Sequence, residues 1–166
     1  MQAILSRRSI RKYTGKAVSE TLINELLQAA MSAPSAGNQQ PWHFVVLTDH
    51  SLMDQVPQFH PYSTMLKEAA LAILVCGDER LQRYEGYWIQ DCSAATENLL
   101  IAARANGLGA VWLGIYPRPE RVDGMRKLLN IPHEITPFAL ISIGYPAEEK
   151  LPASRFDSAR IHKNRW

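Results

Sequence analysis

Hydrophobic residues follow helical spacing in three segments of the chain and form short continuous runs in four others. After Ser19, a residue type that commonly caps helices, apolar side chains recur every three or four positions, and Pro34 lies beyond the end of that helix. The longest helical pattern ends at Gly107, a typical C-terminal stop. The predicted elements are helices at 19–31, 85–106 and 119–130 and strands at 44–47, 71–76, 111–113 and 138–143.

The order of these elements favours an α+β fold with a mixed sheet, because the strands and helices do not alternate as units of similar length. The run 71–76 is apolar at every position, which indicates a central strand buried on both faces. No repeat or Gly/Ser-rich linker divides the 166 residues, so we expect a single domain over 1–166. The tail 148–166 has few core positions, and we expect it either to fray or to lie across another surface such as a second subunit.

Composition excludes several classes of protein. With 46% apolar and 20% charged residues the chain can bury a core and should not be disordered. No apolar run reaches the roughly 18 residues that span a bilayer, and the basic N-terminus is the reverse of a secretion signal. Two cysteines, Cys76 and Cys92, cannot build a disulfide framework, so we expect a reducing, cytoplasmic environment. Cys92 lies on an apolar helical stripe and is expected to be a small buried hydrophobe, and the five histidines share no spacing typical of a metal site.

Positive charge is gathered at the two ends of the chain, although the formal net charge is only +2. The two clusters are Arg7, Arg8, Arg11 and Lys12 near one end and Arg155, Arg160, Lys163 and Arg165 near the other. Guanidinium groups donate paired hydrogen bonds to phosphate, so one hypothesis is an anionic ligand held between the clusters. The alternative is a non-enzymatic module that binds nucleic acid or an acidic partner, against which the low net charge argues.

Two further segments have the composition of binding loops. The first is a rigid, amide-rich turn between a predicted helix and a predicted strand, Pro34-Ser35-Ala36-Gly37-Asn38-Gln39-Gln40-Pro41-Trp42. The second is Gly107-Leu108-Gly109-Ala110-Val111-Trp112-Leu113-Gly114. Its glycines have the wrong spacing for a dinucleotide fingerprint, and the segment follows a helix instead of a strand. Gly114 would still let a planar ligand approach the backbone, and Trp112 beside it either packs in the core or lines such a site.

In order and spacing, the segments 7–13, 34–42 and 107–114 resemble those of the FMN-dependent nitroreductase family, and 138–144 and the basic tail extend the resemblance over nearly the whole chain. The resemblance implies a nitroreductase-like fold, a mixed β-sheet flanked by helices, in an intertwined homodimer with FMN at the subunit interface. It also implies an oxidoreductase that takes electrons from NADH or NADPH and reduces nitroaromatics, quinones or similar acceptors by a ping-pong mechanism.

The resemblance assigns roles to particular residues. Arg7 and Ser9 match contacts to the phosphate and ribityl chain, and Arg11 matches a basic residue at the pyrimidine edge of the flavin. Leu113 and Gly114 match backbone beside the flavin N5. Arg8 could join Arg7 on the phosphate, and Trp112 adjoins the proposed flavin segment. With these two, the full expected set is Arg7, Arg8, Ser9, Arg11, Pro34, Ser35, Ala36, Asn38, Trp112, Leu113, Gly114 and Arg155. No side chain is expected to be catalytic, because the flavin itself carries the redox chemistry.

Some of these assignments concern a second subunit or stay open. The turn from Pro34 to Asn38 would approach the cofactor of the other chain, and Arg155 would reach the phosphate. Residues 49–68 stand where larger members place an asparagine and a lysine on the flavin, and those residue types are not matched here. A flavoprotein of the same fold with different chemistry, namely dehydrogenation, dehalogenation or flavin fragmentation, is the alternative enzymatic hypothesis.

Overall fold

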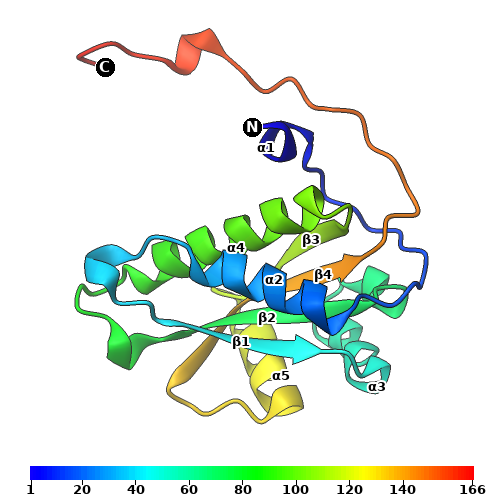
Figure 1. Ribbon diagram of the computed structural model, residues 1–166. Coiled ribbons are helices and arrows are strands. Elements are labelled where there is room, and N and C mark those ends of the chain that lie inside the picture. The colour runs from blue at the N-terminus through cyan, green and yellow to red at the C-terminus, as the bar shows by residue number, and fades with distance from the viewer.

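Four strands and five α-helices make up the computed structural model, which describes all 166 residues (Figure 1). The elements in chain order are α1 (Gln2–Ser6), α2 (Glu20–Met31), β1 (Trp42–Leu47), α3 (His50–Met53), β2 (Leu71–Asp78), α4 (Trp88–Ala105), β3 (Gly109–Gly114), α5 (Pro119–Leu129) and β4 (Ile135–Gly144). All seven predicted segments are confirmed with shifted boundaries, whereas α1 and α3, of five and four residues, were not predicted. None of the helices is both long and apolar enough to cross a lipid bilayer.

The strands form one sheet in the order β1-β2-β4-β3. Every pair of neighbouring strands is antiparallel, and the parallel pairing expected of a mixed sheet is confined to an isolated bridge between Ser9 and Ala110. The sequence could not show this, because apolar runs carry no signal of strand direction. The α+β class is confirmed, and β2 is a central strand buried at all its positions.

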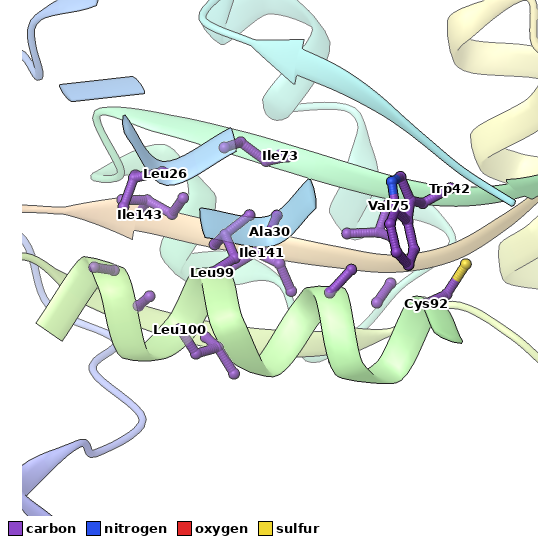
Figure 2. Packing of buried hydrophobic residues seen from close by; sticks show 14 of the residues in the cluster. Leu26, Ala30, Trp42, Ile73, Val75, Cys92, Leu99, Leu100, Ile141 and Ile143 are labelled. Atoms are coloured by element: carbon purple, nitrogen blue, oxygen red, sulfur yellow. The ribbon is translucent and has the colours of Figure 1, made fainter. Parts of the chain in front are cut away.

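One face of the sheet is covered by α2 and α4 (Figure 2). Alternate residues of β2, including Ile73 and Val75, point to this face, as period-two side-chain alternation requires. Leu26 of α2 and Leu99 of α4 are fully buried against them. The Ser19 hydroxyl caps α2 by accepting a hydrogen bond from the Leu22 amide at 3.3 Å, an interaction worth about 1 kcal/mol.

The opposite face of the sheet is covered by α5, α3 and the segment around residues 56–69. Leu74 of β2 and Leu140 of β4 are fully buried on this side, and Met125 of α5 packs over them. The sheet therefore lies between two apolar layers, and its two outer edges are formed by β1 and β3.

Both ends of the chain lie on the β3 side of the molecule, where α1 and the C-terminal tail run past each other (Figure 1). The helix α1 buries no residue, and every residue from 151 to 166 is exposed. The exposed large apolar side chains of these two segments are Met1, Ile4, Leu5, Leu151, Phe156, Ile161 and Trp166. Within one chain, therefore, neither end is packed into the core.

Candidate cofactor site

The N-terminal arginines and Arg155 meet around a hollow of about 330 Å³, here called the terminal cavity. Its lining consists of Ile4, Leu5, Arg7, Arg8, Ala153, Ser154, Arg155 and Phe156. The lining has three guanidinium groups and no carboxylate, which is the composition expected for binding a phosphate. The two ends of the chain, 148 positions apart at Arg7 and Arg155, thus contribute to one positively charged cavity.

Arg7 and Arg8 are positioned differently around this cavity. Arg7 Nε lies 3.3 Å from a carboxylate oxygen of Glu97 on α4, so its guanidinium is oriented by that helix. Arg8 donates from Nε to the Leu151 carbonyl at 2.9 Å and so ties the tail to the N-terminal segment, while its Nη2 is buried without a partner. A neighbouring hollow of about 440 Å³, which is not a candidate site, also adjoins both arginines. Glu148 and Glu149 line it and make it less suited to an anion.

The segment from Arg7 to Arg11 runs beside the outer edge of β3. The Ile10 amide donates to the Ala110 carbonyl at 3.1 Å, and Ile10 is buried. The segment is anchored at its end by Tyr13, whose hydroxyl lies 2.8 Å from the Ile10 carbonyl oxygen. Four residues of extended chain span about 13 Å, so this segment leads from the terminal cavity to the other end of β3.

A second candidate cavity, of about 440 Å³, lies at the C-terminal end of β3 and is here called the edge cavity. Its lining consists of Arg11, His60, Pro61, Tyr62, Thr64, Met65, Trp112, Leu113, Gly114 and Arg121. Gly114 contributes no side chain, and a Cβ added there would meet no atom within 4 Å. Trp112 is partly buried and packs edge-on against Phe138, with ring centroids 5.8 Å apart, so it belongs both to the core and to the cavity wall.

Backbone donors of β3 face this edge of the sheet without partners. The Ala110 carbonyl points outward to Ile10. In a strand, the amide and carbonyl of one residue point to the same side, and every second residue repeats that direction, so the amides of Trp112 and Gly114 also point outward. Outside the helices and the sheet, no acceptor of this chain pairs with either amide. Unpaired backbone donors beside a cavity are suited to a ligand that carries acceptor atoms on a planar edge.

The carbonyl of Gly114 is, in contrast, held by two side chains. Arg121 of α5 donates from Nη1 to this oxygen at 2.8 Å, and the Nε2 of His60 lies 3.1 Å from it. Burial, followed by the nearby charge of Arg121, lowers the pKa of His60 and so favours the neutral imidazole. Because a carbonyl oxygen can only accept, Nε2 is the donor in this contact. Sequence reasoning missed both residues, since nothing in their spacing from Gly114 indicates a contact.

The amide-rich turn is placed against the start of α4 and lines neither the terminal cavity nor the edge cavity. Asp91, only 4% exposed, accepts hydrogen bonds from the Ala36 amide at 2.9 Å and from Gln39 Nε2 at 2.6 Å. Gln39 in turn accepts from the Arg83 amide at 2.7 Å. The turn is therefore rigidly held, and none of Pro34, Ser35, Ala36 and Asn38 lines the cavity that Arg7, Arg8 and Arg155 share.

The two cysteines are buried on the sheet and on α4. Burial raises the pKa of Cys76 to about 12 and raises that of Cys92 further, so both are uncharged thiols at neutral pH. No group of three or more His, Cys, Asp or Glu side chains is placed to hold a metal ion.

Comparison with known proteins shows the family of the chain. The sequence pattern of the nitroreductase family matches residues 4–60 and 58–145. A protein of Methanothermobacter thermautotrophicus named "putative NADH dehydrogenase/NAD(P)H nitroreductase" is 48% identical over the whole chain and 87% of its own length.

Two solved structures share the fold. An FMN-dependent nitroreductase from Clostridium difficile R20291 superposes with a TM-score of 0.92 at 30% identity, over 100% of both chains. A "putative nitroreductase in complex with FMN" from Desulfovibrio desulfuricans superposes with a TM-score of 0.85 at 34% identity, over 99% of this chain and 96% of that one. The chain described here belongs to the nitroreductase family.

Proposed function

We propose that this protein is an FMN-dependent NAD(P)H oxidoreductase that acts as a homodimer and reduces nitroaromatics, quinones or similar acceptors. The observation that carries the proposal is the pairing of two cavities along one strand edge. A three-arginine cavity suited to a phosphate is joined by the extended segment 7–11 to a cavity suited to a planar ring.

The residues present fit FMN on observations made within this chain. Arg8, which lines the terminal cavity, has a buried Nη2 without a partner, and the amides of Trp112 and Gly114 face outward at the strand edge beside the edge cavity. The absence of a Cβ at Gly114 leaves open space against the backbone. A phosphate, a polar chain and a flat ring with acceptor atoms would each find complementary groups.

Each part of the site would have a distinct task. Arg7, Arg8 and Arg155 would hold the phosphate, and the segment around Ser9 would lie along the ribityl chain. Arg11 lines the edge cavity and would offset negative charge at the pyrimidine edge of the ring. Bound FMN supplies hydride acceptance and donation, so no nucleophile or acid–base pair of the protein is required. We infer a ping-pong order in which NAD(P)H and the acceptor occupy the same place in turn.

A second copy of the chain would complete the site. The rigid turn 34–38 lines neither candidate cavity of its own chain, which is the placement expected if it serves the cofactor of a partner. The exposed apolar side chains of α1 and the tail, Leu5 and Phe156 among them, would be covered in such a dimer.

Reconstitution tests the proposal. The purified protein is incubated with FMN, freed of unbound cofactor, and examined for the visible absorbance of flavin, for NADH and NADPH oxidation with and without a quinone, and for mass by sedimentation. We expect retained flavin, quinone-stimulated oxidation and a dimer. Failure to retain flavin, or a flavin-loaded monomer, would contradict the proposal.

A further inference from the structure

The partly buried arginines of the chain divide into two kinds. Arg7 and Arg126 each have a carboxylate within 4 Å, at Glu97 and Asp123. Arg8 and Arg121 are also partly buried but have no carboxylate partner. The two unpaired guanidinium groups lie in the two cavities of the candidate site, Arg8 in the terminal cavity and Arg121 in the edge cavity.

Arg121 is fixed in the edge cavity by uncharged groups. Its Nη1 donates to the Gly114 carbonyl at 2.8 Å, its Nε is buried without a partner, and its Cζ lies 5.9 Å from the centroid of the Tyr62 ring. The cavity lining contains a second guanidinium, that of Arg11, and no acidic residue. Burying a charge without a counter-ion is costly, so an excess of positive charge in one cavity points to a negatively charged ligand.

We propose that Arg121 is a charged positioning residue that fixes the C-terminal end of β3 and stabilises the reduced state of the flavin bound beside it. This inference rests on the proposed function and adds to it a residue of α5 that the family resemblance did not indicate. Hydride transfer to the ring brings two electrons and one proton and leaves one additional negative charge. Arg121 therefore favours the reduced ring more than the oxidised one, and so raises the reduction potential.

A variant of His60 allows the effect of holding the strand end to be measured apart from the effect of the positive charge of Arg121. It holds the same Gly114 carbonyl at 3.1 Å but, because burial lowers its pKa, it adds no charge. Removing the His60 side chain should loosen the end of β3 with little electrostatic effect. Removing the Arg121 side chain should loosen the end of β3 and also remove a positive charge. Arg118, which is exposed at the start of α5 and lines neither candidate cavity, provides a control of equal charge.

The experiment compares the holoproteins of the wild type, Arg121→Met, Arg121→Lys, His60→Gln and Arg118→Met. The midpoint potential of the bound flavin is measured by spectroelectrochemistry, the affinity for oxidised FMN by titration, and folding by thermal unfolding. Lysine keeps the positive charge but not the planar fork of arginine. The midpoint potential of Arg121→Lys should therefore lie closer to that of the wild type than to that of Arg121→Met.

We expect Arg121→Met to weaken binding of reduced FMN about tenfold more than binding of oxidised FMN, which for a two-electron couple is a fall of about 30 mV. Arg118→Met and His60→Gln should stay close to the wild-type potential. An unchanged potential in a folded, flavin-loaded Arg121→Met would overturn the inference. If only the KM for an anionic acceptor then rose, the charge would belong to acceptor binding. Failure of the wild type to bind flavin would instead refute the proposed function.

Discussion

Gly114 offers a substitution that should damage the site without damaging the fold. Its φ is not in the left-handed region, and an added Cβ would meet no atom within 4 Å. Alanine can therefore adopt the native backbone, and removal of a glycine reduces the entropy of the unfolded chain. We expect Gly114→Ala to leave the free energy of unfolding of the cofactor-free protein unchanged or to raise it by about 0.4–1 kcal/mol.

The same methyl group would occupy space that the flavin ring needs. Forcing an additional methyl group into a packed contact typically costs about 1–3 kcal/mol. That cost corresponds to FMN binding that is weaker by a factor of about 5 to 150. The prediction is thus a protein as stable as the wild type with a clearly reduced affinity for its cofactor.

Thermal unfolding of the cofactor-free protein and a fluorescence titration with FMN measure the two quantities separately. Gly109, at the start of the same strand, is the matched control, because a Cβ there would lie 2.6 Å from Cγ2 of Ile10. Gly109→Ala should lower the unfolding temperature, whereas Gly114→Ala should not. A stable Gly114→Ala protein that binds FMN as tightly as the wild type would refute the placement of the ring beside β3.

Three further substitutions test other parts of the account. Asp91→Asn replaces the oxygen that accepts from Gln39 Nε2 by a donor in a buried site, and the free energy of unfolding in urea should fall by about 1–3 kcal/mol. An unchanged urea midpoint would show that these hydrogen bonds do not hold the turn. Arg7→Ala should weaken FMN retention more than Lys12→Ala, since only Arg7 lines the terminal cavity, and equal losses would remove Arg7 from the site. Cys92→Ala should keep most NAD(P)H oxidation at a stability cost of about 1 kcal/mol, and a folded but inactive variant would revive the hypothesis of a catalytic thiol.

Local patterns were sufficient for most of the secondary structure. The Ser19 cap and the apolar stripe after it define α2, and the apolar run at 71–76 correctly predicts a central strand. The helix predicted from Glu85 begins instead at Trp88. Gly86 adopts a φ of 79°, and the preceding loop is held by hydrogen bonds to Gln39, a residue that lies more than 40 positions away. Such long-range contacts are not visible in the spacing of apolar residues.

The candidate site was predictable only in part. The clustering of arginines at both ends of the chain suggested a shared anion, and the structure brings Arg7 and Arg155 to one cavity. The contacts of His60 and Arg121 with Gly114 depend on how α5 and the segment after α3 fold over the sheet edge. Strand direction and side-chain convergence of this kind are tertiary properties, which residue spacing does not encode.

The most direct test of the account compares the affinities of FMN and riboflavin for the wild-type protein by calorimetry. The two ligands share the ring and the ribityl chain and differ by the phosphate. Two charge-assisted hydrogen bonds from the terminal cavity contribute about 3 kcal/mol or more, so we predict that FMN binds at least about a hundredfold more tightly than riboflavin, and that Arg7→Ala reduces this difference. Equal affinities for the two ligands would contradict the claim that arginines from both ends of the chain hold a phosphate.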